Sequence, residues 1–170
     1  TKIIEADGFV TKNKKYALGI LTADCAPIFF YDNKCTIIGA AHAGWRGCLK
    51  NICKSIITVM SENGCTTNNI KAIIGPCIKK NNYEVKKEIF LKYIKKHNGY
   101  KRFFYLNNTN KYNFDLSATL KYQLNNLGVK ASILYREDTY RNQHRYFSHR
   151  RSFHLNEKKT GRMINIIGFK

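Results

Sequence analysis

Three short runs of strand-forming residues follow one another closely in the first quarter of the chain. The runs span 16–21, 27–31 and 36–41, and Asp32-Asn33-Lys34 between the last two is typical of a hairpin turn. Consecutive strands joined in this way pair with each other, whereas a doubly wound parallel sheet needs a helix after each strand. The pattern therefore predicts a mixed sheet with helices outside it and argues against a doubly wound nucleotide-binding fold.

Three longer segments have the three-and-four spacing of apolar residues that is typical of amphipathic helices. Asp115 is a typical N-cap for the last of them, and Gly128 suits its C-terminal end. We expect helices over 47–62, 84–96 and 115–128, and further strands over 70–74, 129–135 and 163–169. With no linker or internal repeat, the 170 residues are expected to form a single α+β (mixed α/β) domain.

Charge is the most unusual feature of the composition. The chain has 30 Lys and Arg residues against 11 Asp and Glu, a net charge of +19. This excess suits a polyanionic partner, but it also follows from a composition rich in Lys, Asn, Ile and Tyr. Because the Lys residues are spread along the chain, we favour the compositional explanation over nucleic-acid binding. Hydrophobic residues make up 44%, which is enough for a buried core and excludes general disorder.

The cysteines bear on the compartment. None of the six forms a C-x-x-C pair, so a zinc ribbon is not expected. The sequence has no secretory signal and no apolar run near the ~18 residues that span a membrane. We therefore expect a cytoplasmic protein with reduced thiols and no membrane partner. Cys48 and Cys53 are expected to be packing residues, and Cys77 to be either structural or an additional reactive thiol.

The sharpest local feature is a pair of motifs, Thr22-Ala23-Asp24-Cys25-Ala26-Pro27 and His42-Ala43-Gly44-Trp45-Arg46-Gly47. Cys25 and His42 lie 17 positions apart on either side of the predicted hairpin, so we expect them to face each other across one cleft. A thiolate and an imidazole suit a zinc ion. They equally suit the nucleophile and base of a thiol hydrolase. Buried packing residues are the third interpretation.

The residues after His42 favour a binding site. Gly44 and Gly47 permit close backbone approach where a strand gives way to a helix, and Arg46 beside the helix amides suits an anion. Trp45 could stack on a planar ring or belong to the core. Asp24 could orient His42 or a sugar hydroxyl, or simply cap a turn.

A second group of polar residues occurs near the C-terminus. Tyr146-Phe147-Ser148-His149-Arg150-Arg151 and the later Gly161-Arg162 bring together arginines, a hydroxyl and aromatic rings. Such residues bind phosphate and bases, although a solvated basic loop has the same composition. We expect Arg150 or Arg151 to point toward the Cys25–His42 cleft.

Taken together, the motifs resemble those of the YfiH-like family, also called laccase-domain or polyphenol oxidase proteins. The resemblance covers nearly the whole chain and includes Asp7-Gly8, Gly75-Pro76-Cys77-Ile78 and Tyr83-Glu84-Val85. It implies a fold of helix, sheet, sheet and helix layers, similar to that of some cysteine hydrolases. It also implies a zinc-dependent purine nucleoside enzyme, acting by phosphorolysis of adenosine, inosine, guanosine or methylthioadenosine and by adenosine deamination. An older description of the family is copper-dependent oxidation of polyphenols.

The same resemblance implies site residues. Cys25 and His42 match two metal ligands of the family, and Asp24 joins them as a catalytic candidate. Arg46, Ser148, Arg150 and Arg151 are the candidates for binding nucleoside and phosphate. The family's third ligand, a histidine in Gln-x-His-Gly, has no match here, so residues 1–170 are interpreted as one domain that lacks its N-terminal segment. With two ligands, we expect metal in this chain to be absent or poorly occupied.

Other interpretations stay open at this point. A Cys25–His42 thiol hydrolase, a copper-dependent polyphenol oxidase and a non-catalytic basic RNA-binding protein all remain. Copper is the weaker metal hypothesis because multicopper sites need more histidines than this region offers. Local pocket shape is also open, because Asp138 and His149 stand where the family has Cys and Tyr.

Overall fold

A five-stranded sheet forms the centre of the computed structural model, which describes residues 5–170. In spatial order its strands are β1 (Gly8–Thr11), β4 (Ile37–Ala43), β3 (Ala26–Asp32), β5 (Lys71–Ile74) and β9 (Lys130–Leu134). Neighbours pair antiparallel except β5 and β9, which are parallel. The predicted mixed sheet and the predicted β3–β4 hairpin are therefore confirmed.

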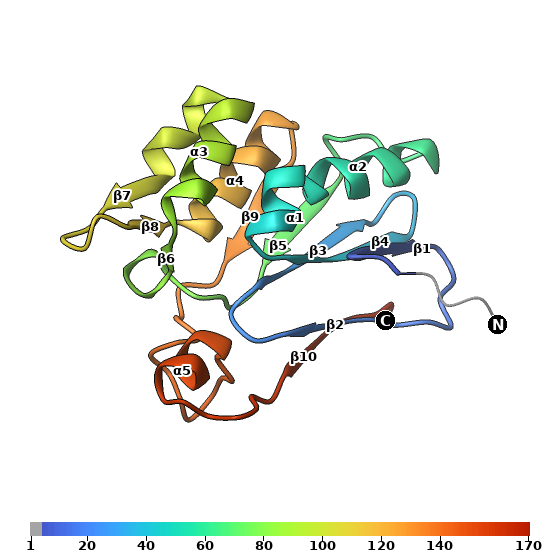
Figure 1. Ribbon diagram of the computed structural model, residues 1–170. Coiled ribbons are helices and arrows are strands. Elements are labelled where there is room, and N and C mark those ends of the chain that lie inside the picture. The colour runs from blue at the N-terminus through green and yellow to red at the C-terminus, as the bar shows by residue number, and fades with distance from the viewer. Residues whose placement is uncertain (1–4) are drawn as a thin grey trace.

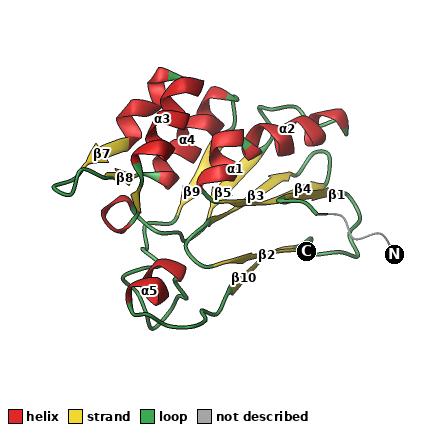
Figure 2. Ribbon diagram, in the orientation of Figure 1, coloured by secondary structure: helices red, strands yellow, loops and turns green. Residues whose placement is uncertain are grey.

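Helices cover one face of this sheet (Figures 1 and 2). They are α1 (Trp45–Lys50), α2 (Ile52–Glu62), α3 (Lys87–Lys96) and α4 (Leu116–Asn126). Helix α2 lies close to β1 and β4 because glycines face it. A Cβ on Gly8 would lie 2.7 Å from Cδ1 of Ile56, and one on Gly39 would lie 3.0 Å from its Cγ2. Larger residues at these two positions would push α2 away from the sheet.

A second, smaller sheet lies across the opposite face. Strands β2 (Leu18–Thr22) and β10 (Met163–Ile167) pair antiparallel, and β2 packs against β4 (Figure 1). The short helix α5 (His149–His154) lies beside this ribbon, on the side away from the large helices. The predicted mixed α/β fold with stacked sheets and outer helices is thus confirmed, but α5 lies beside the small sheet rather than over it, and Leu21, Ile164 and Ile166 on its outer face are exposed.

Two predicted helices differ from the structure. The segment 47–62 is broken at Asn51, whose φ of 61° is left-handed, so α1 and α2 are separate helices. The segment 84–96 becomes helical only at Lys87. Residues Glu84–Val85 instead form β6, which pairs with β8 (Tyr112–Phe114), and β8 pairs with β7 (Phe104–Leu106). Two 3₁₀ helices, Lys80–Asn82 and Asn98–Phe103, complete the described elements.

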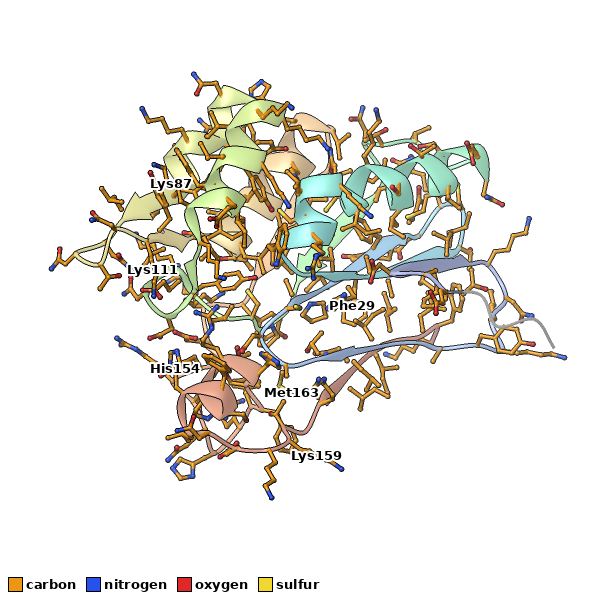
Figure 3. The ribbon with its side chains drawn as sticks, in the orientation of Figure 1. Phe29, Lys87, Lys111, His154, Lys159 and Met163 are labelled. Carbon is orange, nitrogen blue, oxygen red and sulfur yellow. The ribbon has the colours of Figure 1, made fainter. Side chains whose placement is uncertain are left out.

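The core lies between the large sheet and its helices. Phe30, Met60, Tyr93, Phe114 and Leu120 are all buried there. In Figure 3 the labelled Lys87, Lys111 and Lys159 lie at the outside of the molecule, and all three are exposed. Cys48 and Cys53 are buried, as predicted for packing residues, and the six cysteines are free thiols. Among residues 5–170, no helix has the length and apolar character needed to cross a membrane.

Candidate active site

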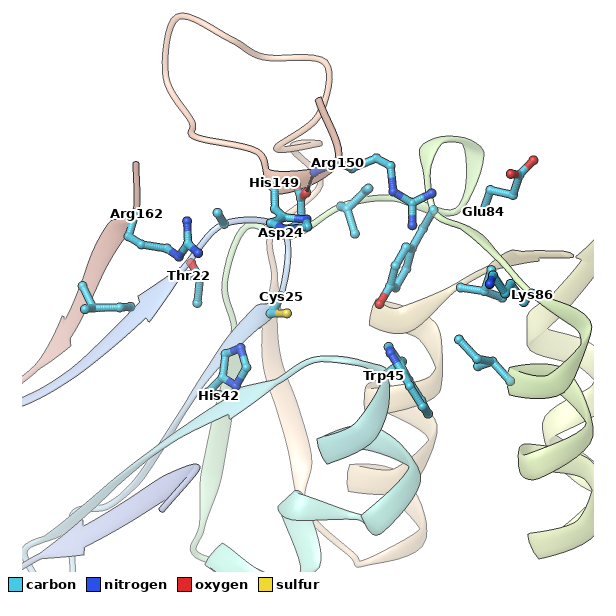
Figure 4. Close-up of a pocket in the computed structure, with 16 residues that line it drawn as sticks. Thr22, Asp24, Cys25, His42, Trp45, Glu84, Lys86, His149, Arg150 and Arg162 are labelled. Atoms are coloured by element: carbon cyan, nitrogen blue, oxygen red, sulfur yellow. Dashed lines mark hydrogen bonds between the residues drawn. The ribbon is translucent and has the colours of Figure 1, made fainter. Parts of the chain in front are cut away.

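A cavity of about 640 Å³ opens where β2 leads into β3 and β4 leads into α1 (Figure 4). Its walls come mainly from parts of the chain that are distant in sequence. These are the β2–β3 corner, the β4–α1 junction, the segment before α3, and the start of α5 with Arg162. The two motifs identified in the sequence therefore meet at one place, at one end of the central sheet.

Cys25 and His42 share this cavity, as predicted. Pro27 pairs with His42 across the β3–β4 hairpin, and Cys25 lies two residues before Pro27, so its side chain points to the same face of the sheet as the imidazole. A Cβ on Gly44 would lie 2.9 Å from Sγ of Cys25 and 4.0 Å from Cε1 of His42. The missing side chain of Gly44 thus lets the Cys25 thiol lie close to the backbone at the start of α1.

Asp7 orients the imidazole. Nδ1 of His42 lies 3.2 Å from Oδ1 of Asp7, and the His42 backbone N donates to the Asp7 carbonyl at 2.7 Å. A carboxylate on Nδ1 favours the tautomer that leaves Nε2 available to a ligand. Of the roles considered for Asp24, orienting His42 thus belongs to Asp7. Asp7 precedes β1, and only the β1–β4 pairing brings it to His42.

Asp24 instead connects α5 to the β2–β3 corner. Its buried carboxylate accepts hydrogen bonds from Thr139 Oγ1 at 2.8 Å, Ser148 Oγ at 2.9 Å and the Arg150 backbone N at 2.7 Å. Ser148 is itself buried and caps α5 by accepting from the Arg151 backbone N. Both side chains are therefore used within the protein, and the expectation that Ser148 binds substrate does not fit its position.

The three candidate arginines have different positions. Arg150 lines the cavity, and its guanidinium lies 5.7 Å from the Tyr83 ring centroid. Arg151 donates to the carbonyls of Thr139, Tyr140 and Tyr146, so it fixes the preceding loop. The exposed Arg46 lies outside the cavity lining, 4.7 Å from the Trp45 ring centroid. Of the adjacent pair, Arg150 thus points toward the cleft as expected, and Arg46 and Arg151 do not contribute to it.

The cavity has an aromatic wall and a cationic rim. Trp45 and Tyr83 line it, and the Trp45 carbonyl accepts a hydrogen bond from Tyr93 on α3 at 2.7 Å, which fixes the start of α1. Burial raises the pKa of the Tyr83 phenol, so the ring is neutral at physiological pH. Lys86, Arg150 and Arg162 also line the cavity (Figure 4). Flat apolar rings beside several cations suit a planar ligand that carries a negative charge or that binds together with a separate anion.

The thiol and imidazole fit two positions of a zinc site. Zinc binds thiolate and imidazole well, and catalytic sites have three protein donors. Within the described part of the chain, however, no third Cys, His, Asp or Glu donor completes a group with Cys25 and His42. Cys77 is fully buried, and His149 lines the cavity without joining such a group. Burial, followed by the charge of Asp24, raises the pKa of the Cys25 thiol to about 11.

Comparisons of this chain with a protein family, with curated proteins and with solved structures agree with one another. The family described as "Multi-copper polyphenol oxidoreductase laccase" matches residues 1–170. A purine nucleoside phosphorylase of Rickettsia conorii is 40% identical over 98% of this chain and 69% of its own length. The adenosine deaminase RL5 of an unknown prokaryotic organism is 32% identical over 91% and 60%. The crystal structure of Bacillus licheniformis hypothetical protein YfiH has a TM-score of 0.87 at 29% identity, over 96% of this chain and 61% of that one. The chain thus spans about two thirds of the length of these relatives.

Proposed function

This chain belongs to the multi-copper polyphenol oxidoreductase laccase family, and from that premise we propose that it acts as a zinc-dependent purine nucleoside enzyme that cleaves nucleosides with phosphate. The observation that carries the proposal is the cavity itself. It places an aromatic wall and the Arg150 guanidinium beside the Cys25–His42 pair. Relatives named purine nucleoside phosphorylase and adenosine deaminase support the same class of substrate.

The residues present suggest a division of labour. The purine base stacks on Trp45 and Tyr83, where contact with planar rings excludes water. Phosphate binds at Arg150, whose planar fork can hold two of its oxygens, with Arg162 and Lys86 adding positive charge. In phosphorolysis a phosphate oxygen forms the bond to ribose C1′, and the C1′–N9 bond breaks with its electron pair leaving on the base. The cationic rim holds the phosphate for this attack.

Cys25 and His42 would hold the zinc ion in this proposal. Because Nδ1 of His42 faces Asp7, Nε2 is left available for a metal, and both Cys25 and His42 line the cavity. A bound zinc ion supplies a Lewis acid that polarises an oxygen or nitrogen of the substrate. Copper is the less suitable metal, because the cavity lining adds only His149 as a further histidine and multicopper centres need more.

Adenosine deamination is the second candidate activity, favoured by the relative named adenosine deaminase. Water would then be the nucleophile, forming a bond to C6 of the purine, and the C6–N bond would break with release of ammonia. The thiol hydrolase interpretation is weaker. Its nucleophile would need to be a thiolate, whereas the raised pKa of Cys25 keeps the metal-free thiol protonated at neutral pH.

The test is a product assay on the protein as encoded in full, with zinc, on inosine and adenosine with and without inorganic phosphate. We expect phosphate-dependent release of hypoxanthine and adenine. Replacing Arg150→Lys should raise the apparent KM for phosphate because the bidentate fork is lost. Arg46→Lys is the matched control, because Arg46 lies outside the cavity. Base release that needs no phosphate would contradict the proposal, and conversion of adenosine to inosine would favour the deaminase.

A further inference from the structure

A second group of metal-binding residue types lies at the other end of β3 from the candidate active site. Asp32 ends that strand, Cys35 follows in the hairpin turn, and Cys65 follows the end of α2. The ligand atoms of these three side chains all lie within 4.8 Å of one another. The strand between Cys25 and Asp32 is about 23 Å long at the usual rise per residue. The group is therefore separate from the active-site cavity.

The buried carboxylate of Asp32 indicates that a ligand binds here. The residue is 1% exposed, and its Oδ1 accepts hydrogen bonds from the backbone N of Lys34 at 2.8 Å and of Cys35 at 3.2 Å. Its Oδ2 is buried and has no hydrogen-bond partner. A buried carboxylate oxygen is normally paired, because removing it from water without a partner is unfavourable. A cation beside Oδ2 would provide that missing interaction.

The two thiols indicate which kind of cation fits. Cys65 is 5% exposed and Cys35 is half-buried, with its Sγ 3.2 Å from the Gly64 carbonyl oxygen. Two sulfur donors and one carboxylate match zinc, whereas magnesium and calcium prefer an all-oxygen environment. Asp32 and Cys35 are separated by two residues in a tight turn, a spacing common between paired ligands of zinc sites.

We propose that Asp32, Cys35 and Cys65 bind a zinc ion, with water or an external ligand in the fourth position. On binding, each thiol releases its proton to solvent and its sulfur forms a bond to the metal, so Zn²⁺ replaces two protons without any redox change. The ion connects the β3–β4 turn to the C-terminal end of α2, two segments that otherwise meet here through Cys35 and Gly64. The site is thus structural and does not depend on the activity proposed above.

A Cys35–Cys65 disulfide is the competing explanation for two neighbouring thiols. A disulfide would leave Oδ2 of Asp32 buried and unpartnered, whereas zinc would pair it. The structure therefore favours metal over oxidation. The Asp32→Asn variant separates the two explanations, because a disulfide needs both cysteines but does not need the carboxylate.

Cobalt titration of the reduced protein tests the proposal, because thiolate-bound Co²⁺ has a charge-transfer absorption that carboxylate or imidazole ligands do not give. The Cys25→Ser variant is the background, so that the active-site thiol cannot contribute. We expect one equivalent of cobalt to produce the band and one equivalent of zinc to displace it. Adding Asp32→Asn, which keeps Oδ1 as the acceptor of the turn, should weaken binding by about tenfold or more.

Cysteine variants in the same background complete the experiment. Cys65→Ser should abolish the band, and the half-buried Cys35→Ser provides the same test should the buried substitution prevent folding, with circular dichroism as the check of structure. A reduced Cys25→Ser protein without a thiolate band would overturn the proposal. A band that survives Asp32→Asn at full affinity would overturn it as well, since the carboxylate would then not be a ligand.

Discussion

Asp24 has a backbone conformation that few residues other than glycine adopt, with a φ of 86° at the corner between β2 and β3. Left-handed backbone is unfavourable for a residue with a Cβ and persists only where surrounding interactions compensate for it. The three hydrogen bonds to its carboxylate, from Thr139, Ser148 and Arg150, provide that compensation. Asp24 is therefore a positioning residue that joins the corner carrying Cys25 to the start of α5, where Arg150 lies.

Replacing Asp24→Asn tests this role. An amide has one acceptor oxygen where the carboxylate has two, so its NH₂ must face a hydroxyl or the Arg150 N–H, and about 1–3 kcal/mol of stability is expected to be lost. The apparent KM for phosphate should rise because α5 no longer holds Arg150 in place. Denaturant unfolding and the product assay measure the two effects. The exposed Glu62→Gln controls for the lost charge, and an Asp24→Asn protein as stable as that control would contradict the assignment.

Gly44 provides a second test at the scale of single residues. Its φ of −85° suits any residue, so Gly44→Ala should leave the backbone unstrained. The added Cβ would lie 2.9 Å from Sγ of Cys25, so the thiol must move and ligand binding beside it should be lost. We expect reduced turnover with little change in melting temperature. In Gly19→Ala, the control, the new Cβ meets Ile164 at an ordinary 3.5 Å, and equal loss of turnover in both variants would contradict a local effect.

At the scale of elements, the sequence predicted β3 and β4 because they are short apolar runs buried on both faces, and α4 because its buried residues recur at helical spacing. It missed the break between α1 and α2, since apolar residues continue through Asn51 in step with a helix. It also missed β6, β7 and β8, which have two or three residues each and are defined only by their pairing. Breaks and short strands depend on tertiary contacts that spacing does not contain.

Asn51 accounts for the helix break and can be tested directly. It has a φ of 61°, and its side chain caps α2 by accepting from the Lys54 backbone N at 3.3 Å. Asn51→Ala removes the cap and leaves a Cβ in left-handed backbone, so we expect a loss of about 1–2 kcal/mol. Asn51→Gly should lose less, because glycine adopts this conformation freely. Chemical denaturation compares the two, and an alanine variant as stable as the glycine variant would show that the conformation is unimportant.

The small sheet of β6, β7 and β8 should contribute a pH-dependent stability. A hydrogen bond from Lys111 Nζ at 2.7 Å is the main cause that lowers the pKa of Glu84. A depressed folded-state pKa stabilises the protein above the unfolded pKa of about 4.3, and this contribution disappears as the pH falls through the folded value. Lys111→Met should therefore reduce stability at pH 7 by at most about 1 kcal/mol, since the pair is partly exposed. The reduction should vanish at acid pH, whereas the exposed control Lys121→Met should show no such trend.

At the scale of the whole molecule, the layered fold explains which site residues the sequence could identify. Cys25 and His42 were predictable because a single hairpin brings them together. Asp7 reaches His42 only through the β1–β4 pairing, and the choice of Arg150 over Arg151 depends on the placement of α5, so both are long-range features. The two motifs, one with Arg46 and the other with Ser148 and Arg151, indicated regions that line the cavity, but they could not indicate which of their side chains turn outward or hold the loop. The Asp32–Cys35 spacing was visible in the sequence, whereas its partner Cys65 was not.

The two ends of β3 should behave as independent metal-binding positions, and stability measurements can establish this. Zinc that binds the folded chain alone stabilises it, by about 2.7 kcal/mol at a hundred times its Kd. Because Asp32, Cys35 and Cys65 offer three donors and the Cys25–His42 pair only two, the zinc-dependent gain should persist in Cys25→Ser and fall to about half or less in Asp32→Asn. Without zinc, the effects of the two substitutions should add within about 0.3–0.5 kcal/mol, as is usual for sites about 23 Å apart. Denaturant unfolding of the unsubstituted protein, the two single variants and the double variant, with zinc and with chelator, measures each of these stability differences. A zinc-dependent gain that disappears in Cys25→Ser instead would place the tight site in the cavity and contradict both the two-donor argument and the independence of the two ends.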